Sequence, residues 1–141
     1  MAKNLKMANA AVNAEANALS EQLNGGYLRE YDGIQPVTGN TSISGQALLA
    51  ELRFGNPAFG SAVNGVITAN SITKESDAKD TGKATWYRCY KSNGTTPIMD
   101  GSIGVKDDPL PGDRYDLEML SNDIVEHAEV EVTSFKHTVI K

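Results

Sequence analysis

The residue pattern of this chain changes from helical to extended at Tyr27-Leu28-Arg29-Glu30-Tyr31-Asp32-Gly33. Before this stretch, apolar residues recur at steps of three and four, whereas after it they alternate with polar residues. The Asp-Gly pair that closes the stretch is a turn signal. This change of period predicts an N-terminal helix followed by a β-rich remainder.

An arm and one helix are predicted on the N-terminal side of the change. Residues 1–6 carry no pattern and indicate a loose arm. Residues 7–23 suit a helix, which Asn24-Gly25-Gly26 ends. Its apolar stripe is mostly alanine and therefore shallow, and it consists of Ala8, Ala11, Val12, Ala16, Leu19 and Leu23. Such a helix can cover the chain's own sheet or lie on a partner, and the pattern leaves both alternatives open.

The remainder of the chain predicts about seven or eight short strands separated by turns. Alternating or apolar runs lie at 27–31, 46–54, 62–68, 84–90, 98–99, 103–105 and 129–140, with polar connections at 36–44, 73–83 and 106–113. A single helix before the strands argues against a parallel α/β sheet, which needs helices between its strands. The predicted fold class is mainly β: a jelly-roll-like antiparallel β-sandwich over residues 25–141, preceded by the arm and helix of residues 1–24.

The last predicted strand contains an irregularity. Its apolar residues split between the two faces of a strand, with Val130 and Val132 on one parity and Phe135 and Val139 on the other. One extra residue is needed to bring all of them to one face. We therefore predict a β-bulge near Thr133-Ser134.

Composition and charge narrow the classes of function. The net charge is -5 and the basic residues are scattered, which argues against direct binding to nucleic acid. A lone cysteine allows no intramolecular disulfide. No stretch approaches the roughly 20 apolar residues that cross a bilayer, and the N-terminus is too polar for a signal peptide. The composition favours a soluble chain made in a reducing cytosol, with no membrane partner.

Residue types that carry out catalysis or bind metals form no recognisable pattern. His127 and His137 lack the close spacing of zinc ligands, so no metal site is predicted. Cys89 is expected to be a small buried hydrophobe rather than an active thiol. The acidic loop around Asp107, Asp108 and Asp113 lacks the register of a calcium loop and is expected to be solvated. We expect no cofactor and no catalytic residues.

Two other patterns suggest binding only weakly. Gly101-Ser102-Ile103-Gly104 lacks the Lys-Ser/Thr pair of a phosphate-binding loop. Trp86, Tyr87 and Tyr90 alternate along a strand, where they fill a sandwich core more often than they stack on sugars or bases.

Several stretches taken in order resemble the family of capsid cementing (decoration) proteins of tailed phages and prophages. They are Leu23-Asn24-Gly25-Gly26-Tyr27-Leu28-Arg29-Glu30-Tyr31-Asp32-Gly33-Ile34-Gln35-Pro36, Leu48-Leu49-Ala50-Glu51-Leu52-Arg53-Phe54-Gly55-Asn56-Pro57-Ala58-Phe59-Gly60, Gly82-Lys83-Ala84-Thr85-Trp86-Tyr87-Arg88, Asp100-Gly101-Ser102-Ile103-Gly104 and Val130-Glu131-Val132-Thr133-Ser134-Phe135. The resemblance runs from about residue 8 to 139. It implies a jelly-roll sandwich displayed as homodimers on the exterior of an icosahedral capsid, where it clamps neighbouring major capsid protein subunits. The loops at 73–83 and 107–116 depart from the family pattern.

This resemblance sets the functional expectations. The chain is expected to be a non-enzymatic virion protein, made in the bacterial host cytoplasm, with the major capsid protein and a second copy as partners. The candidate partner contacts are Lys3, Lys6, Val12, Leu19 and Leu23. The alternative function is a carbohydrate-binding or receptor-binding sandwich of a phage tail, because jelly rolls host lectins as readily as capsid parts. A buried Trp86 would count against this alternative.

Overall fold

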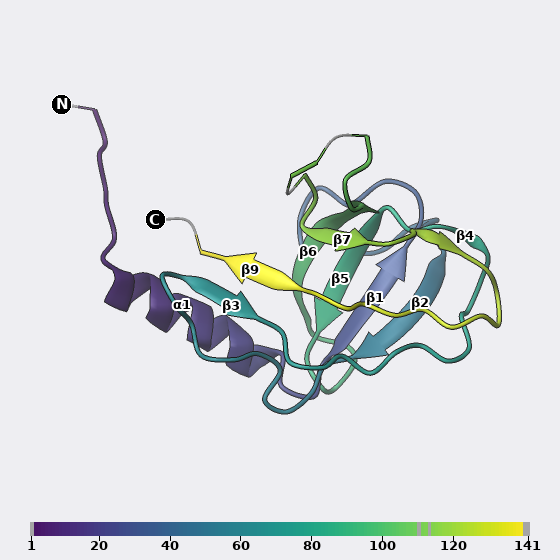
Figure 1. The fold of residues 1–141 in the computed structure, drawn as a ribbon, viewed down its shortest axis with the longest axis horizontal. Coiled ribbons are helices and arrows are strands. Elements are labelled where there is room, and N and C mark those ends of the chain that lie inside the picture. Colours follow the sequence, from purple (N-terminus) through teal and green to yellow (C-terminus); the bar gives the residue numbers. More distant parts are fainter. Residues whose placement is uncertain (1, 110, 113, 140–141) are drawn as a thin grey trace.

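A curled five-stranded sheet forms the body of the computed structural model, which describes residues 2–109, 111–112 and 114–139 (Figure 1). The strand order is β2-β1-β5-β6-β7, with bounds β1 (Tyr27–Tyr31), β2 (Leu48–Arg53), β5 (Trp86–Tyr90), β6 (Pro97–Val105) and β7 (Leu117–Met119). Neighbouring strands are antiparallel except β6 and β7, which are parallel. Two small antiparallel pairs complete the fold: β3 (Val66–Thr68) with β9 (Lys136–Thr138), and β4 (Gly82–Lys83) with β8 (Asp123–Ile124).

This architecture confirms the predicted fold class. The chain is mainly β, its strands are largely antiparallel, and one helix precedes them in a sandwich-like arrangement. The helix, α1 (Asn9–Gln22), lies beside β3 and extends away from the main sheet (Figure 1). It starts and ends close to the bounds of 7–23 predicted from sequence.

Asparagine side chains join α1 and its C-terminal end to the chain that leads into β3. The side-chain oxygens of Asn13, Asn17 and Asn24 accept hydrogen bonds from the backbone N–H groups of Gly65, Ala62 and Ala58, at 2.7, 2.9 and 2.9 Å respectively. These bonds satisfy backbone donors that no strand partner reaches. They hold α1 against its own domain, although the apolar face of this helix is mostly alanine and buries little surface.

A tight hairpin at Asn64-Gly65 precedes β3. Both residues have positive φ angles, 51° and 78°, and Val63 and Val66 exchange backbone hydrogen bonds across the turn. Two consecutive positive φ angles are typical of a type I′ turn, which matches the twist of the flanking strands. A side chain at Gly65 would also press against Val12, so the glycine allows α1 to approach closely.

Phe135 lies at the centre of the hydrophobic core. Its ring packs against Tyr87 at 5.4 Å, Phe59 at 5.9 Å and Phe54 at 6.0 Å between ring centroids. The same core includes Ala16 and Leu23, which α1 and the turn after it supply. The helix therefore shares one core with the strands and does not pack as a separate unit.

The opposite face of the main sheet is held by a buried ion pair. Arg88 binds both carboxylate oxygens of Asp100, at 2.6 and 2.8 Å, and both side chains are 4% exposed. The same guanidinium donates to the carbonyls of Thr41 and Thr38 at 2.8 and 3.3 Å. The loop between β1 and β2 is thereby drawn onto this face, which explains why β5 is buried on both sides.

Two of the strand predictions are wrong in detail. The runs at 98–99 and 103–105 belong to one continuous strand, β6, because the intervening residues pair with β5. The segment at 129–140 is not one strand: residues 131–135 have no strand pairing, and only Lys136–Thr138 pairs, with β3. Ile140, at the end of the predicted strand, and Asp113, in the acidic loop, lie outside the described residues.

The predicted β-bulge at Thr133-Ser134 is corrected to an interruption of the pairing. Val130, Val132 and Phe135 are all buried, so the parity of buried residues does change near the predicted position. No ladder crosses residues 131–135, however, and a bulge needs a continuous ladder on both sides. The interrupted pairing therefore leaves an opening between residues 131–135 and residues 69–72.

Candidate functional site

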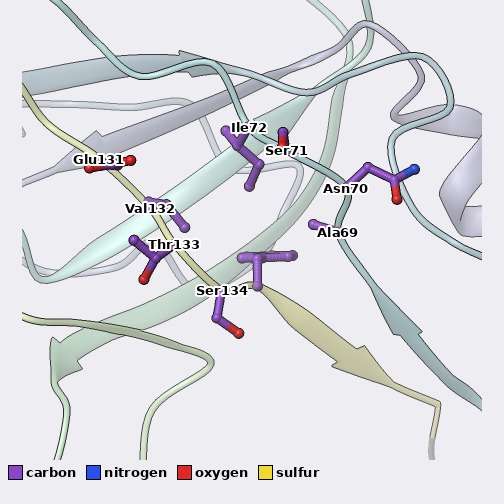
Figure 2. Close-up of a pocket in the computed structure, with 9 residues that line it drawn as sticks. Ala69, Asn70, Ser71, Ile72, Glu131, Val132, Thr133 and Ser134 are labelled. Atoms are coloured by element: carbon purple, nitrogen blue, oxygen red, sulfur yellow. The ribbon is translucent and has the colours of Figure 1, made fainter.

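A groove of about 330 Å³ lies between two extended segments of the fold (Figure 2). One wall is residues 69–72, which follow β3, and the other is residues 131–135, which precede β9. Ile72 and Val132 contribute apolar side chains to the lining, whereas Glu131 is exposed. The volume falls at the lower end of the range of small-ligand pockets, which is roughly 300 to 1,000 Å³.

Backbone pairing holds the two walls together only at their ends. At one end the N–H of Ala69 donates to the carbonyl of Phe135 at 2.8 Å, and at the other Glu75 and Val130 exchange two hydrogen bonds. Within the described part of the chain, residues 131–134 make no backbone hydrogen bond at all. The wall from Ala69 to Glu75 is one residue longer than the facing segment from Val130 to Phe135. The residues between the two hydrogen-bonded ends therefore cannot pair with one another in a single register.

Because the two walls pair with each other at both ends, the groove is a gap within a strand pairing and not an open sheet edge. Water can satisfy the unpaired backbone groups of the exposed residues in this gap. The sequence predicted a bulge at this position but no binding groove. Its only signal was the change of parity between Val132 and Phe135.

The structure divides the predicted partner contacts into two groups. Val12 and Leu23 are fully buried, and Leu19 packs against the core. Val12 and Leu23 therefore face the chain's own core and not a partner, whereas contact of the partly buried Leu19 with a partner stays a prediction. Lys3 and Lys6 are exposed on the arm that precedes α1, so their contact with a partner stays a prediction.

A second exposed surface lies at one end of the main sheet. Ile34, Val37, Leu120 and Val125 have exposed fractions of 83%, 96%, 81% and 59%, and we call this group the apolar end. Hydrogen bonds from the chain between β4 and β5 connect its two segments: Thr85 donates to Gly33, and Ala84 to Asn122. Sequence reasoning missed these residues because isolated apolar residues in polar loops carry no periodic signal.

The structure does not bring together the cysteine and the two histidines that were considered as catalytic or metal-binding candidates. Cys89 is buried, as predicted, and burial raises the pKa of its thiol. His127 is exposed beside Asp77, and this hydrogen-bonded carboxylate raises the pKa of the imidazole. His137 is half-buried, and burial lowers its pKa. Among residues 2–109, 111–112 and 114–139, no group of three or more metal-ligating side chains gathers.

Glu30 is the most unusual titratable group of the structure. It has no exposed surface, and neither carboxyl oxygen has a hydrogen-bond partner among the described residues. Burial raises its pKa to about 8, because water no longer stabilises the charged form. Its cross-strand neighbours are Ala50 and Tyr87. Neither pocket described for the structure is lined by Glu30, so we assign it no chemical step.

Gly101, in the stretch compared with a phosphate-binding loop, has a packing role instead. It lies in the middle of β6, and a Cβ atom there would collide with the ring and hydroxyl of Tyr87. The glycine therefore makes room for a core tyrosine. The aromatic residues Trp86, Tyr87 and Tyr90 are all buried, which confirms the prediction that they fill the interior.

No family model, curated protein or solved structure matches this chain. No helix of the described residues has the length and apolar character that crossing a membrane requires.

Proposed function

We propose that this chain is a structural virion protein that binds the outside of an icosahedral phage capsid and cements neighbouring major capsid protein subunits. The observation that carries the proposal is the ordered resemblance to the cementing proteins over residues 23–36, 48–60, 82–88, 100–104 and 130–135. In the structure these stretches supply β1, β2, much of β5 and β6, and one wall of the groove. They therefore include the residues that build the body of the fold.

The exposed surfaces fit a role in protein contact. The apolar end presents aliphatic side chains to solvent, and such side chains gain free energy when a partner covers them. A cement needs only modest affinity at each contact, because many copies act together on one shell. We therefore assign shell contact to the apolar end.

Carbohydrate binding through Trp86 has little structural support. This residue is fully buried, and its indole N–H is bonded to the carbonyl of Asp32. Sugar-binding sites present an accessible aromatic face, because the sugar stacks against it. We propose no second function.

The test uses expanded capsids that lack this protein, mixed with the purified chain. We expect saturable binding and a higher temperature of capsid disruption, measured by light scattering and electron microscopy. Ile34→Lys should weaken binding by about fivefold or more, since it places a charge where an apolar contact forms. Ala18→Lys, at an exposed position on α1 outside the apolar end, is the control and should bind as the natural chain does. Capsids that disrupt at the same temperature with and without saturating protein would refute the proposal.

A further inference from the structure

A second pocket, of about 510 Å³, lies where β4 and β8 approach the end of β6 (Figure 1). Its lining includes Tyr115, Asp108, Asn122, Asp123 and Lys83. The volume lies within the range of small-ligand pockets, which is roughly 300 to 1,000 Å³. The pocket is therefore large enough to take one long side chain of a partner.

Tyr115 gives the pocket an aromatic wall. Its side chain is partly exposed, and its ring lies directly against Gly104 in β6. A Cβ atom at Gly104 would come within 2.1 Å of two ring atoms, so the glycine makes room for the ring. A partly exposed ring beside carboxylates is a surface on which a planar cation can stack.

Two lining side chains carry hydrogen-bond acceptors without a partner. Asn122 is 7% exposed, and its Nδ2 donates to the carbonyl of Ala84 at 2.9 Å, which fixes the orientation of the amide. Its Oδ1 accepts no hydrogen bond from the described residues. Within the same part of the chain, the carboxylate of Asp108 has neither an ion pair nor a hydrogen bond. A nearly buried oxygen that lacks a partner is rare in a folded protein and is available to a ligand.

The donors of the pocket are largely committed within the chain. The hydroxyl of Thr85 donates to a backbone carbonyl at 2.6 Å, and the hydroxyl of Ser102 donates to Asp116 at 3.0 Å. The ammonium of Lys83 is paired with Asp123 at 2.8 Å. The pocket therefore offers mainly acceptors, and it fits a ligand that carries only donors. A sugar fits less well, because its hydroxyl groups both donate and accept.

The pocket is continuous with the apolar end. Asn122 and Asp123 lie between Leu120 and Val125, two of the exposed residues that define that surface. The neighbouring stretch 106–118 carries five acidic residues against two basic ones, which favours a positively charged ligand. A protein that covers the apolar end can therefore place a cationic side chain in the pocket.

We propose that this pocket binds the guanidinium group of an arginine side chain on the protein that covers the apolar end. A guanidinium carries five N–H donors and no acceptor, and its plane stacks on an aromatic ring. It would stack on Tyr115 and donate to Asp108 and to Oδ1 of Asn122. The identity of the partner rests on the proposed function, which assigns shell contact to the apolar end.

Short peptides test the pocket in the purified chain without a capsid. The probe is acetyl-Gly-Arg-Gly-amide, followed through the backbone amide resonances of Gly104, Val105 and Asn122. We expect saturable shifts with a Kd of about 1–5 mM. The same peptide with citrulline, which keeps the shape but lacks the charge, should bind at least about fivefold more weakly. Equal affinity for the citrulline or lysine peptide would overturn the assignment, as would methyl glucoside binding in place of the arginine peptide.

Substitutions in the same assay test which side chains bind the probe. Asp108→Asn and Tyr115→Ala should each weaken binding by about fivefold or more, whereas Tyr115→Phe keeps the ring and should bind within about twofold of the natural chain. Glu15→Gln, on the exposed face of α1, removes the same charge outside the pocket and is the control for Asp108→Asn. Equal effects of these two variants would show that net charge alone attracts the peptide, which contradicts the proposed site.

Capsid binding tests the identity of the partner separately. On expanded capsids, Asp108→Asn should bind at least about fivefold more weakly than Glu15→Gln. If Asp108→Asn binds capsids as the natural chain does, the shell does not supply the arginine and that part of the proposal is wrong. Peptide binding by a chain that binds no capsid would refute the capsid function and leave the guanidinium site in place.

Discussion

Trp86 stacks on Tyr31, with ring centroids 4.6 Å apart and an angle of 16° between the ring planes. The two residues face each other across the β1–β5 pairing, and the indole N–H donates to the carbonyl of Asp32 at 2.9 Å. Trp86 has no exposed surface. This stacked pair therefore joins β1 to β5 on the face opposite the phenylalanine core, and it offers no surface to a ligand.

Removing the indole should destabilise the fold. Trp86→Ala is expected to lower the free energy of unfolding by about 3–5 kcal/mol, because a large buried side chain leaves a cavity. Trp86→Phe keeps an aromatic ring and should cost less, although it loses the hydrogen bond to Asp32. Urea unfolding followed by far-UV circular dichroism measures both. A Trp86→Ala chain that is as stable as the natural one but has lost glycan binding would revive the carbohydrate function.

The ion pair between Arg88 and Asp100 should be costly to break and cheap to replace. Arg88→Met leaves a buried carboxylate without its partner, so we expect a loss of about 3–5 kcal/mol. Arg88→Met combined with Asp100→Leu should recover most of this loss. Hydrogen exchange should show less protection in the loop that contains Thr38 and Thr41 for both variants, because both remove the guanidinium that binds it. Unchanged exchange in that loop would contradict the assigned role.

Glu30 should make stability depend on pH. Its folded pKa of about 8 lies above the ordinary value of 4.5. Between pH 4.5 and 8, the folded state therefore keeps a proton that the unfolded state has lost. The contribution of Glu30 to the free energy of unfolding is therefore greatest below about pH 4.5 and falls as the pH rises toward 8. Above the folded pKa this contribution changes no further. The largest slope from one proton is about 1.4 kcal/mol per pH unit.

The measurement is urea unfolding at several pH values between 5 and 9. Glu30→Gln keeps the shape of the side chain and should remove most of the slope. Glu30→Leu should also raise stability at pH 8, since it replaces an unpaired buried polar group with an apolar one. Glu15→Gln, on the exposed face of α1, is the control and should leave the slope unchanged. The assignment fails if Glu30→Gln unfolds with the same pH dependence as the natural chain.

The hydrogen bond from Gly65 to Asn13 should hold the β3 hairpin against α1. Asn13→Ala removes the acceptor, and we expect a loss of about 0.5–1.5 kcal/mol, slightly offset by the better helix propensity of alanine. The amide of Gly65 should exchange faster with solvent, which nuclear magnetic resonance can follow for this single group. Glu15→Ala, on the exposed face of the same helix, should leave that amide unaffected. Equal exchange of Gly65 in both variants would argue against the contact.

Local patterns were sufficient for much of the fold. β1 was predicted with its observed bounds and α1 close to its observed bounds, because hydrophobic period and turn residues act over a few positions. The burial of Cys89 followed from the usual burial of a free cysteine, and that of Trp86 from the tendency of strand aromatics to fill a core. Such features depend on the chain's nearest neighbours in sequence, which are visible without a structure.

Long-range pairing was not visible in the same way. The parity change after Val132 was read as a bulge, because a sequence cannot show which segment will lie opposite or how long that segment is. The groove exists because the opposing segment, Ala69 to Glu75, is one residue longer between the pinned ends. Likewise, the alanine stripe of α1 could not decide between its own domain and a partner.

The sequence by itself determined that the chain is mainly β with one N-terminal helix, because hydrophobic period and turn residues act locally. Only the tertiary structure decided that Val12 and Leu23 are covered, that Glu30 is buried without a partner, and that residues 131–134 keep an unpaired backbone. Each of these depends on which distant segments meet and in what register. Register is a property of two segments together, so neither segment's sequence contains it alone.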